Sequence, residues 1–494
     1  MLKKIKGFLF ENTAVRQTIV KNTFWLTVSN FGGRLIKAVV IVYAARVLGT
    51  SGWGVFSYAI TLAAFVSLVV DPGVNATLMR ESSKADEEDR RTIFSTALVV
   101  KLFLLVFGIG LIVFIAPYFS TLPGAKALLP IVAMVLTFDT FREFLSSLIR
   151  GKEKMEWEAG IFLLTNFAII AFGFIFLAIS PTPKSFAWGY AAGTAIGAIA
   201  ATIVLRDYFK KIFSRFSFRL IPPMLTSAWP FAITGTLGLL LTNTDILIIS
   251  WMRTASDVGI YSAGIRIIQI LYLIPSIFQL STMPLFARLA NRENDKFRIV
   301  FERTISFIFL VSIPLAVGGA ILGTQILHLL FGQSYESGGL AFKILMITML
   351  VDYPATIISA AIFAYNHQKS LIITSAIGGI ANVAFDLILI PKFGITGSAV
   401  ATLIAQTLSN WYLWRTMNKL NRFEILPRLK RVFAAAVFML LLTVTLFFLH
   451  VNVIINIIAS ALLYVALLKT FREPLLEEII AVLPTSSAAK TPVA

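Results

Sequence analysis

The sequence predicts an all-α polytopic membrane protein with about 14 transmembrane helices. Three observations support this fold class. Hydrophobic residues make up 57% of the 494 residues and charged residues only 14%, against roughly 25% in ordinary soluble domains. Apolar stretches of about 20 residues, the length that crosses a bilayer, recur along most of the chain. The 43 lysines and arginines gather mainly in alternate connecting segments, as expected of cytoplasmic loops.

The elements follow in order from these patterns. The basic segment 1–22 has no long apolar core with a cleavage site, so we expect an uncleaved amphipathic helix on the cytoplasmic membrane surface. A predicted N-lobe, 23–205, holds apolar stretches at 23–44, 54–78, 93–116, 127–149, 159–179 and 185–205. After the basic linker 206–223, a predicted C-lobe, 224–417, holds stretches at 225–250, 258–283, 304–330, 340–364, 371–390 and 395–417. Two shorter stretches, 431–448 and 451–468, complete the segment 418–468 before a tail, 469–494.

The cations predict the orientation of these spans. Clusters of Lys and Arg occupy 80–91, 206–219, 288–303 and 415–431, while the alternate loops carry few. By the positive-inside rule, both termini are expected in the cytoplasm. The net charge of +18 is therefore interpreted as a mark of cytoplasmic loops, and no nucleic-acid partner is expected.

The two predicted halves contain similar motifs. The first reads WGVFSYA at 53–59 and the second VGIYSAG at 258–264. Because each half has an even number of spans, both halves share one orientation, and a duplication would relate them by a two-fold axis along the membrane normal. A separate stripe of Gly189, Gly193 and Gly197 is interpreted as a packing surface for a neighbouring helix.

The sequence lacks the residues that several kinds of chemistry require. The chain has no cysteine and only three scattered histidines, so neither a disulfide nor a His- or Cys-based metal site is expected. No GxxxxGK[ST] phosphate loop occurs, which removes the sequence basis for ATP-driven transport. We expect no catalytic residue, no bound metal and no cofactor.

Cations within the spans are the main functional candidates. Arg34 and Lys37 lie about 16 Å and 21 Å along the span 23–44, at 1.5 Å per residue, and share a helix face with Asn30. That span contains no acidic residue. Because a charge at this depth is costly, we expect a cavity-lining anion site in preference to a pairing with another helix. Lys101 lies nearer a span end, where we expect it to reach the interface.

Other intramembrane charges leave alternatives open. Arg266 lies about 13 Å into its span and could line the cavity or pair with Asp245. Arg142 has Asp139 three residues before it and Glu143 beside it, so local compensation competes with substrate binding. The acids that could form ion pairs or bind a coupling ion are Asp139, Glu143, Asp245, Asp352 and Asp386.

Five strings carry a family resemblance: AARVLGTSGWGVFSYAITL, DPGVNATLMRESSK, LIRGKEKMEWEA, DVGIYSAGIRI and IPKFGITGSAVATLIAQ. Their order and spacing resemble the polysaccharide transporter branch of the multidrug, oligosaccharidyl-lipid and polysaccharide exporter superfamily, which includes lipid-linked oligosaccharide flippases. The resemblance implies two pseudo-symmetric six-helix lobes around a cavity that opens alternately to each side, plus two C-terminal helices.

The implied activity is transport and not catalysis. The resemblance implies a flippase that moves a polyprenyl-pyrophosphate-linked glycan outward within the bilayer, with its anionic head in a cationic cavity. Coupling to H⁺, Na⁺ or the membrane potential is possible on this basis, as are partner polymerases or glycosyltransferases of the same pathway.

Two alternatives are weighed against this interpretation. A multidrug or organic-cation antiporter of the same superfamily would benefit from carboxylates in its first-half cavity, but the span 23–44 carries cations there. A membrane glycosyltransferase or glycan ligase would need an acidic residue in an outer loop, and the first such loop, 46–53, has none.

Overall fold

The computed structural model describes residues 15–210 and 215–476, which are nearly all helical and contain no β-strand. Expectations for 1–14, 211–214 and 477–494 lie outside the described residues. In the first half, the helices are α2 (Val15–Val70), α3 (Val74–Lys84), α4 (Glu87–Gly110), α5 (Ala116–Phe119), α6 (Ala125–Gly151), α7 (Met155–Ile179) and α8 (Pro183–Val204). They are followed by α9 (Ile221–Met252), α10 (Ala255–Leu271), α11 (Leu273–Leu289), α12 (Asn294–Phe331), α13 (Gly339–Ile347), α14 (Met349–Ala364), α15 (Gln368–Leu420), α16 (Leu426–Phe448) and α17 (Val453–Thr470).

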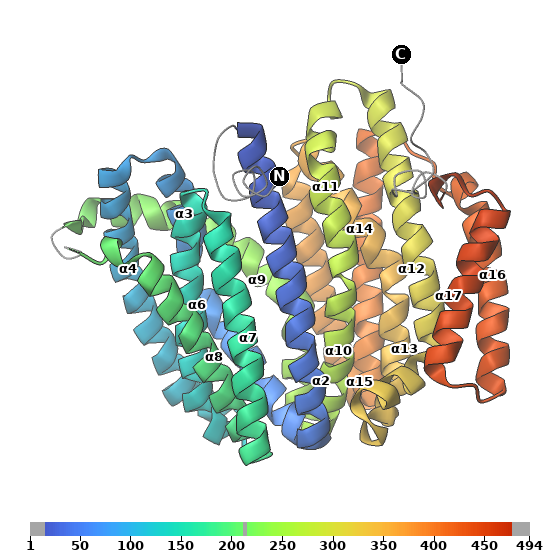
Figure 1. Ribbon diagram of the computed structural model, residues 1–494, viewed down its shortest axis with the longest axis horizontal. Helices are drawn as coiled ribbons and strands as arrows, with labels where there is room; N and C mark the ends of the chain where they lie inside the picture. Colours follow the sequence, from blue (N-terminus) through green and yellow to red (C-terminus); the bar gives the residue numbers. More distant parts are fainter. Residues whose placement is uncertain (1–14, 211–214, 477–494) are drawn as a thin grey trace, which may run out of the picture. The chain divides into compact units, whose positions relative to one another are not determined.

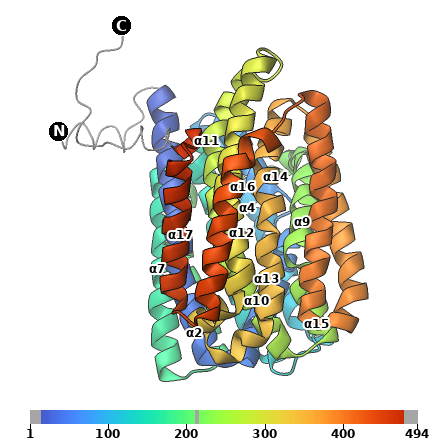
Figure 2. The ribbon, with the colours of Figure 1, turned by 90° about the vertical axis from the view of Figure 1, so that its right-hand side faces the viewer.

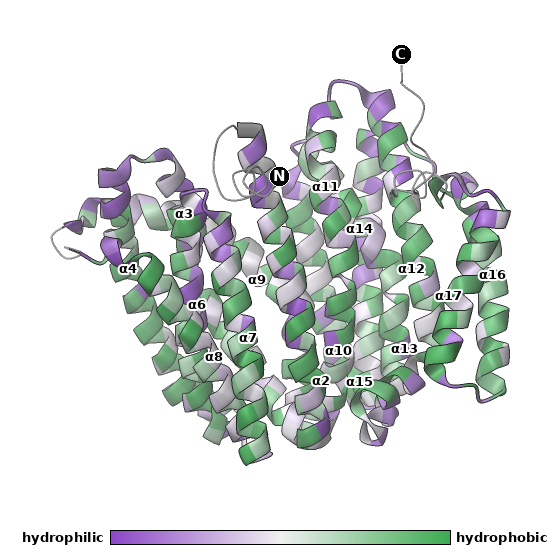
Figure 3. Cartoon of the chain, in the orientation of Figure 1, coloured by the Kyte–Doolittle hydropathy of each residue, from purple (hydrophilic) through white to green (hydrophobic). Residues whose placement is uncertain are grey.

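The chain is a multi-pass membrane protein. Among the described residues, ten helical segments are long and apolar enough to cross a bilayer. Two of these segments each combine two predicted spans, because α2 is interrupted at Gly49 and α15 at Gly394, where the backbone φ is positive. Figure 3 shows hydrophobic residues along most of the length of the helices. The number of about 14 spans stays a prediction.

The first helix begins before the predicted span. Helix α2 starts at Val15, so residues 15–22 are helical and continuous with the span that follows them. The buried Lys21 ammonium lies 2.9 Å from a carboxylate oxygen of Glu156 on α7. This ion pair fixes the beginning of α2 against another helix.

The chain divides into two compact units. The first comprises Met1–Ile270 and Asn382–Ser398, and the second comprises Leu271–Ala381 and Ala399–Ala494. Helix α15 therefore contributes to both units. These boundaries differ from the predicted linker 206–223, so the predicted lobes and the compact units are different divisions of the chain.

The glycine stripe of α8 is a packing surface in the first unit, where α6, α7 and α8 are neighbours (Figure 1). A Cβ atom on Gly189 would collide with the backbone of Phe172, and one on Gly193 with the backbone of Ile169. Only a residue without a side chain permits this close approach to α7. The sequence interpretation of the stripe is confirmed.

The two similar motifs meet in the first unit. A Cβ atom on Gly54 would collide with the carbonyl oxygen of Ala255, and one on Gly259 with the carbonyl oxygen of Thr50. Ser256 Oγ also donates to Thr50 Oγ1 at 2.8 Å. Equivalent residues of a duplicated structure come together where they lie on its two-fold axis. This reciprocal contact supports the interpretation of the motifs as an internal repeat.

In the second unit, α16 and α17 form a helical hairpin, which Figures 1 and 2 show side by side. Thr443 Oγ1 of α16 donates to Ser460 Oγ of α17 at 2.8 Å, in a buried environment. Tyr464 Oη of α17 donates to the carbonyl oxygen of Leu310 on α12 at 2.9 Å. The first bond joins the two helices of the hairpin and the second ties the hairpin to α12, in a hydrophobic interior where an unmade hydrogen bond is costly.

Candidate functional site

The predicted cations of the first span have no acidic partner. Arg34 is exposed on α2 and makes no hydrogen bond or ion pair within the described part of the chain. The Lys37 ammonium lies 4.7 Å from the centroid of the Tyr190 ring on α8. Asn30 is exposed and donates to the carbonyl oxygen of Leu26 at 2.9 Å. Helix α2 therefore presents two cations to the solvent-accessible surface of the first unit, one of them against an aromatic face.

Arg266 on α10 does not pair with Asp245. Its Nη1 donates to Gln269 Oε1 at 3.0 Å, and Tyr190 is its neighbour in electrostatic range. Asp245 instead accepts from the Tyr261 hydroxyl and the Asn382 amide. These polar groups occupy both oxygens of Asp245, so the pairing alternative left open by the sequence is not realised.

Tyr190 is a residue that the sequence did not indicate. It lies beside Lys37 of α2 and within electrostatic range of Arg266 of α10, helices that are far apart along the chain. A tyrosine within a Gly- and Ala-rich helix gives no specific signal of such a role. Only the packing of α8 between other helices brings it to both cations.

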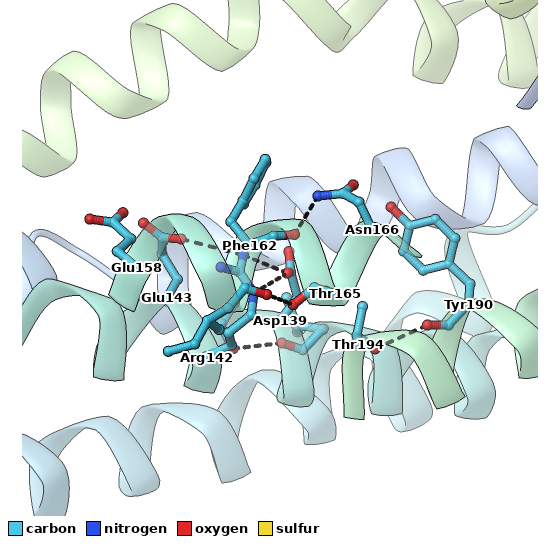
Figure 4. A network of polar contacts seen from close by, with 12 residues as sticks. Asp139, Arg142, Glu143, Glu158, Phe162, Thr165, Asn166, Tyr190 and Thr194 are labelled. Carbon is cyan, nitrogen blue, oxygen red and sulfur yellow. Dashed lines mark hydrogen bonds and ion pairs between the residues drawn. The ribbon is translucent and has the colours of Figure 1, made fainter. Parts of the chain in front are cut away.

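Arg142 belongs to a compensated charge cluster (Figure 4). Its Nη2 lies 2.9 Å from Asp139 Oδ1 and 3.4 Å from Glu143 Oε2, and its side chain is buried. Arg150 in turn lies 2.8 Å from Glu143 Oε1 and 2.6 Å from Glu158 Oε1. Two arginines thus face three carboxylates. The structure realises the local compensation that the sequence left open for Arg142, and it shows Asp139 and Glu143 in ion pairs.

A polar pocket of about 290 Å³ lies beside this cluster in the first unit. Its polar lining includes Ser67, Asp71, Asn75, Lys101, Asp139, Thr140, Glu143 and Tyr190. Tyr190 lines this pocket and also contacts Lys37, so it connects the pocket with one of the two uncompensated cations. Asp71 and Asn75 were not among the predicted site residues, because their roles depend on packing between separate helices.

The expectation that Lys101 reaches the interface is wrong. Its side chain is fully buried, and Nζ donates to the carbonyl oxygen of Val70 at 3.2 Å and lies 4.0 Å from Asp71 Oδ2. Val70 is the last residue of α2, where a helix leaves carbonyl groups without N–H partners. That free carbonyl and the nearby carboxylate hold the ammonium inside.

A second group of acids lies around α15 in the first unit. Asp386 is fully buried and accepts from Asn382 Nδ2 at 3.3 Å, while the same amide donates to Asp245. Asn382 Oδ1 and Asp386 Oδ1 are buried without a hydrogen-bond partner. Within residues 15–210 and 215–476, no group of three or more His, Cys, Asp and Glu side chains is arranged to hold a metal ion.

Asp352 has a different setting, in the second unit. It accepts from the Tyr272 hydroxyl at 2.5 Å and from Asn410 Nδ2 at 2.9 Å. Tyr272 separates α10 from α11, and Pro275 cannot donate to the carbonyl of Leu271. Instead, the Tyr353 hydroxyl donates a hydrogen bond to the carbonyl oxygen of Leu271 at 2.7 Å. The bonds made by Asp352 and its neighbour therefore stabilise a break between two helices.

Comparisons with known proteins place these features in context. The model of a family described as "Polysaccharide biosynthesis protein" matches residues 19–290. "Probable flippase AglR" from Haloferax volcanii is 24% identical over 408 residues, covering 79% of this chain and 82% of the relative. "Capsular polysaccharide biosynthesis protein CapF" from Staphylococcus aureus is 21% identical over 415 residues, covering 80% and 99%.

Solved structures share the fold. "Lipid II flippase MurJ, inward closed conformation" aligns with a TM-score of 0.76 at 18% identity, covering 92% of this chain and 99% of that one. An inward-facing multidrug resistance MATE family transporter aligns with a TM-score of 0.60 at 13% identity, covering 85% and 98%. With these relatives, the chain stands among transporters and flippases and not among enzymes such as glycosyltransferases or ligases.

Proposed function

Because this chain belongs to the Polysaccharide biosynthesis protein family, we propose that it is a flippase for a polyprenyl-pyrophosphate-linked oligosaccharide. The lipid-linked glycan would move from the cytoplasmic to the outer leaflet of the plasma membrane by alternating access. The proposal includes about 14 spans in two six-helix lobes with two further helices, and cytoplasmic termini. The names of the flippase and polysaccharide relatives and the shared flippase fold support it.

One observation carries the proposal: Arg34 and Lys37 have no neutralising acid at a depth where charge is expensive. A pyrophosphate group in a water-accessible cavity would supply the missing negative charge. The guanidinium of Arg34 suits bidentate contact with phosphate oxygens, while Lys37 acts as a point charge. Arg266 would extend this cationic surface beyond Tyr190.

The adjoining polar pocket suits the sugar part of the same molecule. Asp71, Asp139 and Glu143 offer carboxylate oxygens that accept hydrogen bonds from sugar hydroxyls, and Asn75 offers an amide. Tyr190 lies between this pocket and Lys37. A head group with phosphate at the cations and its first sugar in the pocket would use both surfaces at once.

The acidic lining also favours a second candidate function, an organic-cation antiporter. Carboxylates in a first-half pocket are what such a transporter needs, and a multidrug transporter shares the fold. Against this candidate, the ammonium of Lys101 lies beside Asp71 in the same pocket, and Arg142 and Arg150 pair with Asp139 and Glu143. The acids are therefore largely neutralised within the protein.

Reconstitution of the purified protein in proteoliposomes separates the two candidates. We expect it to transfer a fluorescent lipid-linked pyrophosphate oligosaccharide between leaflets, measured by the fraction of label open to a membrane-impermeant quencher. An inside-negative potential should accelerate outward movement, since each negative charge gains about 2.3 kcal/mol per 100 mV. Absence of transfer together with uptake of an organic cation against an ion gradient would favour the antiporter.

Coupling to an ion is the remaining part of the proposal. The buried oxygens of Asp386 and Asn382 would bind Na⁺ or exchange a proton during the transport cycle. We predict that Asp386→Asn removes stimulation of transfer by a Na⁺ or H⁺ gradient while leaving transfer driven by the membrane potential. Asp352→Asn, which alters a buried acid at the helix break, is the matched control and should keep the stimulation. Unchanged stimulation in Asp386→Asn would exclude this residue as the coupling site.

A further inference from the structure

A basic pocket lies in the second unit, outside the candidate transport site. It has a volume of about 500 Å³ and is lined by residues of α12, of the first turns of α16 and of the segment after α17. Its cationic side chains are Arg303, Arg428, Lys430 and Arg431. Arg428, Lys430 and Arg431 are in the first two turns of α16, and Lys and Arg near the end of a membrane-spanning helix meet lipid head groups. Hydrophilic residues gather at this end of α16, whose length is otherwise mainly hydrophobic (Figure 3).

The cations of this pocket exceed the acids available to them. Glu302 pairs with Arg428 at 2.8 Å. Arg431 Nη1 donates to the carbonyl oxygen of Arg472 at 2.8 Å, which fixes the guanidinium without cancelling its charge. Lys430 is exposed and forms no ion pair with any other described residue. The excess positive charge therefore remains at the pocket.

Glu473 is the remaining acid of the lining. It is only 3% exposed, and its Oε2 has no hydrogen-bond partner. Burial raises the pKa of Glu473, and the nearby charge of Arg431 opposes this rise only in part. A carboxyl group held closer to its neutral form cancels less of the positive charge, and in that form it can donate a hydrogen bond to an anion.

An apolar groove lies next to the basic pocket. Its volume is about 630 Å³, and Pro427 lines both cavities. The groove is lined mainly by large apolar side chains: Phe309, Trp414, Phe423, Leu426, Leu429 and Phe433. Leu426 is 76% exposed and Phe433 45% exposed, on a surface that faces lipid in a membrane-spanning helix. The combined shape offers a phosphate-sized cationic end beside a surface for a hydrocarbon chain.

We propose that this composite cavity is a binding site for an anionic phospholipid, with the phosphate group at Lys430 and Arg431 and an acyl chain along the groove beside Phe433. A phospholipid and free phosphate share the phosphate group, which either ligand could place in the basic pocket. The lipid is favoured over free phosphate because the apolar groove lies next to the basic pocket, with Pro427 lining both cavities. The proposal is independent of the glycan flippase function, since the phospholipid carries no glycan.

The test measures lipid binding by native mass spectrometry of the full-length protein in detergent. The probes are phosphatidylglycerol, phosphatidylcholine with the same acyl chains, and inorganic phosphate. Two neighbouring cations near the membrane surface contribute about 1 kcal/mol each, so Lys430→Gln with Arg431→Gln should weaken phosphatidylglycerol binding about thirtyfold. Lys419→Gln with Arg422→Gln removes equal charge from two exposed positions outside the pocket, in the last turn of α15 and just after it, and should change binding less than threefold.

Three outcomes would overturn the proposal. Equal loss of binding in the two double variants would mean general attraction to surface charge. Equal binding of phosphatidylcholine by the unmodified protein would mean that the basic pocket contributes nothing. Inorganic phosphate that displaces phosphatidylglycerol at equal concentration would identify a site for a soluble anion. Phosphatidylglycerol binding that is selective, lost in Lys430→Gln with Arg431→Gln and kept in the control supports the proposal.

Discussion

Two groups of cations in the first unit differ in how their charge is neutralised. On α6, Arg142 and Arg150 are surrounded by Asp139, Glu143 and Glu158, with ion-pair distances from 2.6 Å to 3.4 Å. On α2, Arg34 and Lys37 have no carboxylate in range among the described residues, and Lys37 faces only the ring of Tyr190. The first group is satisfied within the protein, whereas the second is not.

We propose that this difference separates charges that stabilise the fold from charges that bind the substrate. A charge inside a membrane protein is tolerated when a partner compensates it or when water reaches it. Compensated arginines need no ligand to explain them, so their removal should harm folding first. Uncompensated cations that line an accessible surface are available to an anionic substrate, so their removal should harm transport and leave folding intact.

The largest expected effect is on transport. We predict that Arg34→Ala with Lys37→Ala lowers the rate of glycan-lipid transfer in proteoliposomes at least about 100-fold, since two charge-assisted contacts of 1.5–3 kcal/mol each are removed. The melting temperature should stay within a few degrees of that of the unmodified protein. Lys126→Ala with Lys184→Ala removes two exposed cations elsewhere in the first unit and should retain transport. Normal transfer by Arg34→Ala with Lys37→Ala would contradict the distinction between compensated cations that stabilise the fold and uncompensated cations that bind the substrate.

An intermediate effect is expected on stability. Arg142→Leu leaves Asp139 without its partner and should lower the free energy of unfolding by roughly 1.5–3 kcal/mol, measured by reversible unfolding in mixed micelles. Adding Asp139→Asn should recover part of this loss, because the unpaired charge is then gone. Transport per folded molecule should change less than threefold. A stable Arg142→Leu protein that cannot transport would assign Arg142 to the substrate instead.

The smallest expected effect concerns Tyr190. Replacing its ring by Tyr190→Leu removes the cation–π contact with Lys37, worth about 0.5–1 kcal/mol, and should raise KM about two- to fivefold. Tyr190→Phe keeps the aromatic face and should behave like the unmodified protein. Equal KM values for the Leu and Phe variants would show that the ring does not position Lys37.

Local patterns predicted the parts of the structure that depend on one helix. Spacing along the helix gave the Arg142–Asp139 pair as one of two alternatives for Arg142, and the glycine stripe of α8 predicted a packing surface. Contacts between separate helices were not predictable in this way. Lys101 was expected at the interface but is held inside by a helix-end carbonyl, and Tyr190 gave no signal at all. Such contacts depend on which helix faces pack together, and one sequence does not reveal this.

The acidic residues, too, make contacts between separate helices that the sequence did not predict. Asp245 is near Arg266 in sequence, yet it bonds to Asn382, which is 137 residues away along the chain. For Asp352 the sequence left a place in an ion relay open, and the structure adds its hydrogen bond to Tyr272 at the break between α10 and α11. Their positions in apolar stretches predicted that these acids were unusual, while their individual roles depend on tertiary partners.

The most direct test of the central claim is the affinity of the unmodified protein and of Arg34→Gln with Lys37→Gln for a polyprenyl pyrophosphate that carries no sugar. Binding can be measured in nanodiscs of uncharged lipid, where surface charge contributes little. If these two cations hold the anionic head, the dissociation constant should rise at least about 100-fold in the double variant and little in Arg142→Gln. Equal affinity of the unmodified protein and the double variant would contradict the account.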